Sequence, residues 1–358
     1  MSERRNTSNQ HSRKKRRKKK SNPKKVLLGC LIAIFAISII IFAVDNMIGN
    51  MFGAGEEIPD NIKTAEEVKD DVVNILVCGL DYEEGRSGYM ADVIVYVTMD
   101  VKGKTIKALQ IPRDTYVGEP SATGKINGVY QAGKEKDSIM NVIKTINERF
   151  GLSVDHYATL DMEAFIKIVD GIDGGLPMYV PYPVKTKDKN GREHTVIAEP
   201  GTYNIGGETA EAIVRNRNYG GSDMQRLEVQ GYFYAAVIKY FKELGISDTL
   251  KILPRYTPYI TTDMHWSRMA SLAATAMNIS YEDMALIKPG VRGLIVGKQN
   301  VLEIPQDEWL QIINDNFRPH QTPVEKLNID PIKGEITKDY GQTPISVTNI
   351  GELLADAS

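Results

Sequence analysis

Beyond residue 71 the apolar and polar positions of the chain follow two alternating patterns. Short apolar runs of strand length are followed by segments in which apolar residues recur every three or four positions, the spacing of one helix face. The run from Val72 to Leu80 is almost continuously apolar, as in a strand covered on both faces. This alternation predicts an α/β fold, a three-layer α/β/α domain with a central mixed sheet.

The predicted elements cover most of the chain. Strands are expected at 72–80, 93–99, 105–111, 154–160, 178–184, 285–287 and 293–296, and helices at 138–150, 162–170, 208–214, 222–244, 267–278, 306–317 and 350–355. Asp137 or Ser138 is the expected N-cap of the first helix, and Gly151 is its expected C-terminal stop. Pro181 and Pro183 place the strand that contains them at a sheet edge, and the polar residues 185–200 predict an exposed hairpin or insertion.

A second kind of apolar segment, Val26 to Val44, precedes this domain. Its 19 uncharged residues, at ~1.5 Å per residue in a helix, are just long enough to cross a hydrocarbon core of ~30 Å. A cleaved signal peptide has a shorter apolar stretch of ~7–15 residues and ends at a small-residue cleavage site, which this segment lacks. We therefore expect one transmembrane helix.

Residues 1–25 carry twelve Lys or Arg and one Glu. A nucleic-acid-binding arm has the same composition, but the apolar segment that follows favours a membrane orientation signal, so we expect no nucleic acid partner. Basic flanks stay in the cytoplasm, and this one should contact anionic membrane lipids. The expected location is the cell membrane, with a single pass, a cytoplasmic N-terminus and an extracellular C-terminal domain.

The chain therefore divides into five expected regions. These are a basic cytoplasmic tail (1–25), a transmembrane helix (26–44), an extracellular stalk (45–71), the α/β domain (72–330) and a C-terminal extension (331–358). The two cysteines are Cys30 and Cys78, so the exported part has one thiol and no internal disulfide. A domain of this size buries enough surface to be stable without one.

Three charged residues lie at the ends of predicted strands. Asp81 follows the first strand, Asp92 precedes the second, and Arg113 follows the third in the sequence Ile111-Pro112-Arg113-Asp114. Strand ends are where open α/β sheets place their binding sites. Each of the three residues is also an ordinary turn residue, which is the alternative interpretation for Asp81 above all.

The stretch 208–230 gathers further cationic groups. If Arg215 to Arg217 is extended, both arginine side chains face one site. Ser222 and Gln225 predict a capping box that opens the next helix, whose apolar stripe continues backwards to Gln230 and Arg226. Guanidinium groups that converge on a helix N-terminus suit a phosphate or diphosphate; the alternative is that Arg226 pairs with Asp223 or Glu228.

Several catalytic signatures are absent from the sequence. It contains no Walker A loop, HExxH, CxxC or GxSxG motif, so P-loop hydrolysis, zincin chemistry, thiol redox chemistry and an α/β-hydrolase nucleophile lack their signatures. The five histidines are scattered, and none has the spacing of a catalytic partner.

The motifs that are present, taken in order, resemble those of the LytR-CpsA-Psr family. The likeness spans roughly residues 72–244 behind a single membrane span. It rests on Gly79-Leu80-Asp81, Asp92, Ile111 to Tyr116, Lys125-Ile126-Asn127, Asp170 to Gly175, Arg215-Asn216-Arg217, Asp223, Arg226 and Gln230. The family is one of single-span enzymes of Gram-positive envelopes. The resemblance implies transfer of a glycan phosphate, such as teichoic acid or capsular polysaccharide, from an undecaprenyl-diphosphate carrier to peptidoglycan.

The resemblance also implies roles for individual residues. Asp81 and Asp92 are the expected ligands of Mg²⁺ (or Mn²⁺), and Arg113 and Arg217 the expected catalytic residues. Residues expected to bind the substrate diphosphate are Lys125, Arg215, Arg217, Arg226 and Gln230. Two positions depart from the family pattern: Met90 stands where the family commonly has Arg, and Val229 stands where it often has Arg. Both remove positive charge from the expected site.

Two other functions are compatible with the same residues. A non-catalytic envelope regulator would only bind the polyprenyl diphosphate, and a pyrophosphate hydrolase would use water as the acceptor. In all three cases the prenyl chain must leave water, so we expect a deep apolar cavity beside Arg215 and Arg217, with helices 138–150 and 232–244 as its walls.

The predicted topology can be tested on intact protoplasts. Because the basic flank should hold residues 1–25 in the cytoplasm, added protease should remove the C-terminal domain and spare the N-terminus. Immunoblots against tags at the two ends would measure this. Cleavage of the N-terminal tag with a protected C-terminal domain would contradict the topology.

Overall fold

The computed structural model describes residues 71–357, except 84, 87, 120, 133–137, 188–189, 217–218, 220–221 and 253–254. The predicted cytoplasmic tail, transmembrane helix and nearly all of the stalk lie outside the described residues. Within the part that is described, no helix combines the length and the apolar character that a membrane span requires.

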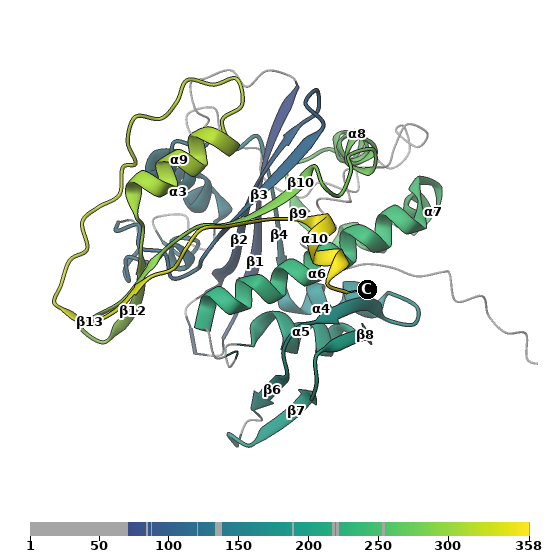
Figure 1. Ribbon diagram of the computed structural model, residues 1–358, viewed down its shortest axis with the longest axis horizontal. Helices are drawn as coiled ribbons and strands as arrows, with labels where there is room; N and C mark the ends of the chain where they lie inside the picture. The colour runs from purple at the N-terminus through teal and green to yellow at the C-terminus, as the bar shows by residue number, and fades with distance from the viewer. Residues whose placement is uncertain are drawn as a thin grey trace, which may run out of the picture.

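The described strands and helices follow the chain in the order shown in Figure 1. The strands are β1 (Val72–Asp81), β2 (Met90–Asp100), β3 (Thr105–Ile111), β4 (His156–Asp161), β5 (Leu176–Val180), β6 (Val184–Lys187), β7 (Glu193–Ile197), β8 (Gly201–Ile205), β9 (Thr261–Thr262), β10 (Met284–Lys288), β11 (Arg292–Val296), β12 (Gln299–Glu303), β13 (Ile336–Gln342) and β14 (Ser346–Asn349). The helices are α3 (Ile139–Phe150), α4 (Met162–Asp170), α5 (Gly207–Arg215), α6 (Ser222–Leu244), α7 (Ile246–Ile252), α8 (Trp266–Met277), α9 (Gln306–Asn316) and α10 (Ile350–Ala355).

A mixed sheet forms the centre of the domain. Among the described residues it has seven strands in the order β14-β10-β3-β2-β1-β4-β9. Strand β2 runs antiparallel to both of its neighbours, β1 and β3, while β4 is parallel to β1 and β10 is parallel to β3. The predicted mixed sheet is thus confirmed, and β1, β3, β4 and β10 all end at the same edge of it.

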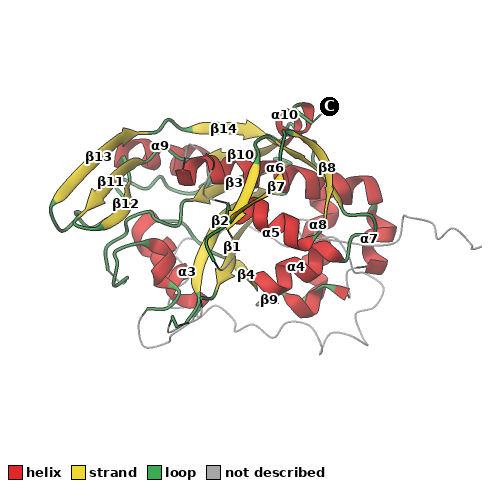
Figure 2. Ribbon diagram, turned by 90° about the horizontal axis from the view of Figure 1, so that it is seen from below, coloured by secondary structure: helices red, strands yellow, loops and turns green. Residues whose placement is uncertain are grey.

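Helices cover both faces of this sheet, which gives the predicted three layers (Figures 1 and 2). Alternate side chains of a strand point to opposite faces, so Val73, Ile75 and Val77 of β1 join a core with α4, α5, α6, α8 and α10. Leu76 and Cys78 of the same strand join a second core with α3 and α9. Burial on both faces explains why β1 is apolar almost throughout.

Local signals set the ends of several helices where they were predicted. The Ser138 hydroxyl accepts a hydrogen bond from Met140 N at the start of α3, and Gly151 ends that helix with a φ of 67°. Such a left-handed C-cap costs glycine nothing. The Asp161 carboxylate caps α4 in the same way by accepting from Ala164 N. Asp170, at the end of α4, then accepts from Gly207 N at 2.7 Å and holds the start of α5.

The predicted strand 178–184 is wrong as a single element. Prolines 181 and 183 lack the N–H that a ladder needs, and the chain forms two short strands instead, with β5 pairing to β8 and β6 to β7. The β6–β7 pair is the exposed hairpin that the polar residues 185–200 predicted. Strands β8, β9, β12, β13 and β14 and helix α7 were not predicted.

Residues 331–358 were predicted as an extension, but the described part of this segment pairs and packs with the rest of the domain. Strand β14 pairs with β10 at one edge of the main sheet, and β13 pairs with β11 in a three-stranded sheet of order β12-β11-β13. Helix α10 begins with a capping box between Asn349 and Glu352 and packs on α6 through Ile350 and Leu353.

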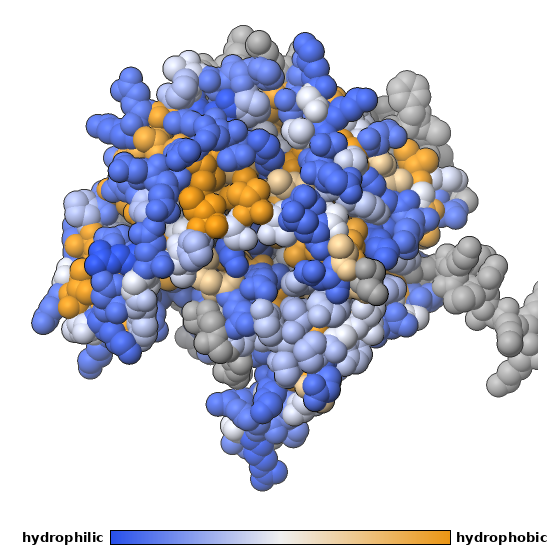
Figure 3. Space-filling view, in the orientation of Figure 1, coloured by the Kyte–Doolittle hydropathy of each residue, from blue (hydrophilic) through white to orange (hydrophobic). Residues whose placement is uncertain are grey.

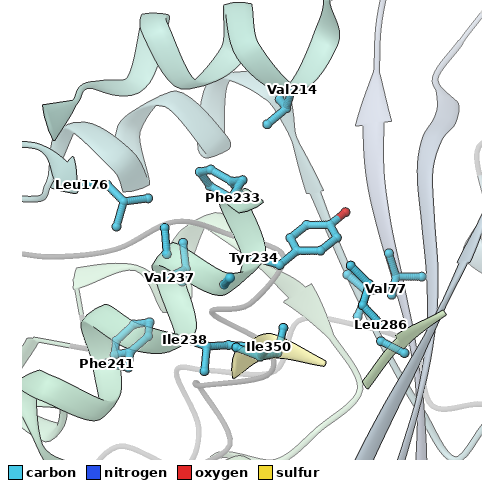
Figure 4. Packing of buried hydrophobic residues seen from close by; sticks show 14 of the residues in the cluster. Val77, Leu176, Val214, Phe233, Tyr234, Val237, Ile238, Phe241, Leu286 and Ile350 are labelled. Atoms are coloured by element: carbon cyan, nitrogen blue, oxygen red, sulfur yellow. The ribbon is translucent and has the colours of Figure 1, made fainter. Parts of the chain in front are cut away.

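Helix α6 lies across one face of the sheet and is buried around most of its middle. Phe233, Val237 and Phe241 are almost fully buried, as the predicted stripe requires. Figure 4 shows Tyr234 and Ile238 on the side of α6 that meets the sheet, with Ile350 of α10 beside Ile238. The helix therefore joins the C-terminal helix to the central sheet.

The contribution of α10 can be measured by truncating its buried leucine. Leu353→Ala removes a side chain that is 7% exposed in the core beside α6, and such truncations cost ~2–5 kcal/mol. The neighbouring Leu354 is only partly buried, so Leu354→Ala should cost clearly less. Denaturant unfolding of both variants gives the comparison, and equal losses would contradict the packing of α10.

Candidate functional site

The site lies where β1 and β3 end and β2 begins. Because β2 is antiparallel to both, Asp81, Asp92 and Arg113 meet at one edge of the sheet. The register shifts at this point, with Val93 opposite Gly79 but Ala91 opposite Leu80, so Asp92 is the extra residue of a β-bulge. A bulge re-aims the side chain that it carries. A Cβ on Gly79 would lie 3.1 Å from Val93 Cβ, which is why glycine suits this crossing.

The Asp81 carboxylate is held by two arginines. Arg215 Nη2 lies 3.1 Å from its Oδ1, and Arg86 Nη2 lies 3.3 Å from its Oδ2. Arg215 also donates to Glu211 Oε1 at 2.7 Å. Burial lowers the pKa of Arg215, but Glu211 and Asp81 outweigh it and raise that pKa above its ordinary value. Arg215 is therefore a fixed cation at the mouth of the site.

Asp92 is held by a different pair of groups. Arg113 Nη1 donates to its Oδ2, and Asn127 Nδ2 donates to its Oδ1 at 3.3 Å. Arg113 is 9% exposed, and its Nε also lies 3.8 Å from Asp114 and 3.9 Å from Asp223. Burial alone would lower the pKa of Arg113, but these three carboxylates raise it. The guanidinium stays charged although it is largely removed from water.

The first turns of α6 supply the next polar groups. Arg226 and Gln230 are 3% and 2% exposed, so the inward line of the helix turns polar here as predicted. Arg226 Nη2 lies 2.8 Å from Asp223 Oδ1, so the alternative partner considered from the sequence is present as well. Gln230 Nε2 donates to Val214 O at 3.1 Å, while its Oε1 has no hydrogen-bond partner among the described residues.

A narrow pocket opens between these charges and the core under α6. It has about 610 Å³ of empty space, part of it open to solvent. Its polar end is formed by Asp81, Asp92, Arg215, Arg226 and Gln230, and its apolar walls by Leu80, Val93, Leu160, Met162, Phe165, Val214, Phe233 and Tyr234. In Figure 4 Phe233 and Tyr234 extend from α6 below Val214.

The structure has an apolar pocket beside Arg215, as predicted, but its enclosed space is only about 50 Å³. The predicted deep cavity is therefore not formed in this structure, and one of its predicted walls is also different. Helix α6 lines it through Phe233 and Tyr234, as expected. Helix α3 does not, because it packs on the opposite face of the sheet. Its place is taken by α4, through Met162 and Phe165.

Of the remaining predicted site residues, Lys125 does not line the pocket described above and Arg217 lies outside the described residues. Lys125 Nζ lies 2.8 Å from Asp114 Oδ1, and both residues line a second hollow with Arg113. Arg217 and the residues just before Ser222 lie outside the described residues. Arg215 itself is the last residue of α5 and not part of an extended Arg215 to Arg217 segment, so that local prediction is wrong at Arg215.

The structure adds charged residues that sequence reasoning did not assign to the site. Arg86, in the loop between β1 and β2, reaches Asp81, and Asp114 and Asp223 neutralise Arg113. Asp81 pairs directly with Met90 across the two strands. Arg86 therefore brings positive charge to the carboxylate that faces Met90, where the family pattern has an arginine. The one signal in the sequence for this role was that Arg86 lies close to Met90 along the chain, although it is out of register with the family position.

The carboxylates of Asp81 and Asp92 suit a hard cation that takes most of its ligands from water or phosphate. Mg²⁺ prefers oxygen ligands and often takes only one or two carboxylates, the rest being water and phosphate oxygens. The described residues hold no group of three or more His, Cys, Asp or Glu arranged to bind a metal. A metal at Asp81 and Asp92 would thus need oxygens from a phosphate ligand or water.

Comparison with known proteins identifies the relatives of this chain. A model described as the LytR_cpsA_psr family matches residues 45–318. The chain belongs to the LytR-CpsA-Psr family. The match includes every residue of the site described above.

Named members of the LytR-CpsA-Psr family resemble the chain in sequence and fold. The polyisoprenyl-teichoic acid–peptidoglycan teichoic acid transferase TagV of Bacillus subtilis is 29% identical over 172 residues, covering 45% of this chain and 42% of TagV. The corresponding transferase TagT of the same organism is 26% identical over 295 residues, covering 80% of this chain and 82% of TagT. The solved structure of TagT bound to LIIa-WTA has a TM-score of 0.55 at 23% identity, over 74% of this chain and 97% of that one.

The role of Arg86 can be tested with inorganic pyrophosphate and Mg²⁺ as the probe. Arg86→Met should weaken binding about tenfold, ~1.4 kcal/mol, as expected for losing a hydrogen bond to a charged group. Met90→Arg in the same variant should restore the affinity, because position 90 faces Asp81. Calorimetric titration measures both.

Lys144→Met, on the exposed side of α3, is the matched control and should bind like the wild type. An Arg86→Met variant with unchanged affinity would show that Arg86 does not contribute to the anion site.

Proposed function

We propose that this protein transfers a phosphate-linked glycan, of the teichoic acid or capsule type, from an undecaprenyl-diphosphate carrier to peptidoglycan. The observation that carries the proposal is the pocket under α6, which is apolar at its inner end and has two carboxylates and two buried or half-buried arginines at its mouth. A lipid diphosphate has the same division, an apolar chain joined to a compact anion. The transferase names of TagV and TagT support the reaction class.

The proposed reaction is a displacement at phosphorus. A hydroxyl oxygen of the acceptor forms a bond to the glycan-bearing phosphorus, and the bond from that phosphorus to the bridging oxygen of the diphosphate breaks. The hydroxyl proton is lost to a base, and undecaprenyl phosphate leaves. Catalysis of such a transfer depends on positioning and on cations that offset charge on the phosphate oxygens.

The positions of the described arginines support this proposal. Arg113 reaches the site from the end of β3, where Pro112 restricts the backbone that leads to it, and Arg226 reaches it from the first turns of α6. Arg215 approaches from the end of α5. Planar guanidinium groups can donate two parallel hydrogen bonds to a phosphate, and we assign the same role to Arg217, which lies outside the described residues.

All four carboxylate oxygens of Asp81 and Asp92 already have a partner in the structure. The oxygens of Asp81 form ion pairs with two arginines, and those of Asp92 accept hydrogen bonds from an arginine and an asparagine. When a diphosphate enters, the arginines can release the carboxylates and bind phosphate oxygens in their place. Mg²⁺ (or Mn²⁺) held by Asp81 and Asp92 would then compensate the carboxylates and add positive charge against the phosphates. Lys125 and Gln230 complete the polar lining that we assign to the substrate.

The membrane anchor that we infer from residues 26–44 would serve the same reaction. A carrier lipid is confined to the bilayer, so tethering the domain beside it raises the effective concentration of substrate. The basic tail would add contacts to anionic headgroups on the cytoplasmic side. The α/β domain would then act on the outer face, where peptidoglycan lies.

The metal and arginine assignments are tested with the full-length protein, lipid-diphosphate glycan and peptidoglycan. Asp81→Ala and Asp92→Ala should abolish metal-dependent transfer without unfolding the domain. Arg217→Ala should lower turnover by ~10²–10³, the usual cost of losing a charge-stabilising donor. Lys239→Ala changes an exposed side chain of α6 and should retain wild-type turnover.

Four outcomes would contradict the proposal or one of its residue assignments. Full, chelator-resistant transfer by the Asp variants would exclude the metal assignment, and wild-type turnover in Arg217→Ala would exclude that arginine. Release of the glycan phosphate at equal rates with and without peptidoglycan would indicate a hydrolase. Tight lipid binding with no product in either case would indicate a regulator.

A further inference from the structure

A second and larger hollow lies beside the apolar pocket. It has about 1540 Å³ of empty space, including space open to solvent. One wall consists of Arg113, Asp114, Lys125 and Asp223 of the site, and the other of Gly293, Leu294, Asn300, Val301, Leu302, Tyr340, Gly341 and Thr343. We call it the β13 groove, because residues in and next to β13 form its outer wall. Of the residues in this wall, Tyr340, Gly341 and Thr343 lie beyond residue 318, where the family match ends.

Backbone hydrogen bonds fix the β13 groove to the loop that begins with Pro112 and Arg113. Tyr116 N donates to Leu302 O at 2.8 Å, and Leu302 N donates to Asp114 O at 2.9 Å. Strand β12 is therefore paired side by side with the segment that follows Arg113, through a parallel bridge between Thr115 and Leu302. Strand β13 is attached in turn through its pairing with β11. The outer wall is thus held at a set distance from the reacting groups.

Two ion pairs separate the groove from the apolar pocket. Asp92 lines the pocket and its partner Arg113 lines the groove, while Arg226 lines the pocket and its partner Asp223 lines the groove. A phosphate bound among these residues would have the pocket on one side and the groove on the other. In phosphoryl transfer the attacking and leaving oxygens are roughly in line. If the lipid phosphate leaves toward the pocket, the acceptor hydroxyl must arrive from the groove.

The chemistry of the outer wall suits a saccharide. All seven residues of β13 are exposed, so Tyr340, 60% exposed, does not serve a core. The ammonium of Lys338 lies 4.4 Å from the centre of the Tyr340 ring, so a sugar that stacks on this ring would displace the flexible lysine side chain. The tyrosine ring then offers a flat apolar face with a polar hydroxyl, which matches the C–H face and hydroxyls of a sugar ring. The exposed amide of Asn300 can both donate and accept hydrogen bonds. Figure 3 shows that the surface around β12 and β13 is mostly hydrophilic.

We propose that the β13 groove binds the acceptor glycan strand, with Tyr340 as a stacking platform and Asn300 as a hydrogen-bonding partner. This inference rests on the proposed function, since it is the transfer reaction that requires an acceptor on this side. The proposal gives the residues in and next to β13 a role in the choice of the acceptor. The donor then occupies the pocket under α6, and the two substrates meet across Arg113.

The test uses the full-length protein and soluble peptidoglycan glycan oligomers as the probe. Tyr340→Ala and Asn300→Ala should each raise the oligomer concentration for half-maximal transfer about tenfold or more, with kcat and the Kd for the lipid donor unchanged. Tyr340→Phe keeps the ring and should behave like the wild type. Tyr203→Ala, an exposed tyrosine on β8 that does not line the groove, is the matched control.

Direct titration of the oligomer separates failure of this inference from failure of the proposed function. If the wild type binds the oligomer and Tyr340→Ala does not, the groove is a glycan site even if no transfer occurs. If transfer proceeds but Tyr340→Ala binds and uses the oligomer like the wild type, the groove assignment is overturned and the transferase stands. A fall in donor affinity alone would assign the groove to the donor glycan and overturn the acceptor role.

Discussion

Mutual neutralisation of carboxylates and guanidinium groups at one edge of the sheet is the constraint on which this site depends. Isolated buried charges are very costly, and each becomes tolerable only when it is paired. Arg113 and Arg226 are almost fully buried, and they are paired with Asp92 and Asp223. The same pairing stores cations in a place that is largely removed from water, where their attraction for an incoming anion is strong.

The strand arrangement explains why these charges meet. An antiparallel β2 between β1 and β3 brings two strand ends and one strand start to a single edge, and the bulge at Asp92 re-aims its side chain there. Helix α6 closes the arrangement from one face of the sheet. Its first turns are polar and its middle is apolar, so one helix contributes both to the cluster of charged residues and to the wall of the apolar pocket. A change in the angle of α6 would therefore affect both parts together.

Much of this could be predicted because the deciding signals are local. The bounds of β3, α4 and α10 agree with their predicted ranges, since apolar runs and cap residues mark them. Strand β13 escaped prediction because all seven of its residues are exposed and no apolar alternation exists to detect. At the site, Asp81, Asp92 and Arg113 follow from strand ends. Arg86 could not be predicted in this way. It lies in a loop, where no periodic pattern of apolar residues exists, and the path of a loop depends on contacts with residues far away in the sequence.

The position of β14 and α10 has a consequence for how the chain acquires its structure during synthesis. Strand β10 pairs with β3 across more than 170 residues of sequence, and only the final residues cover its other edge and the adjoining part of α6. Domains fold as units, and pairings between distant segments form slowly. The growing chain must therefore keep one open sheet edge and an uncovered apolar helix face until its last residues have emerged. A ribosome that stops some thirty residues early would release a chain with an exposed edge strand, the kind of surface that promotes aggregation.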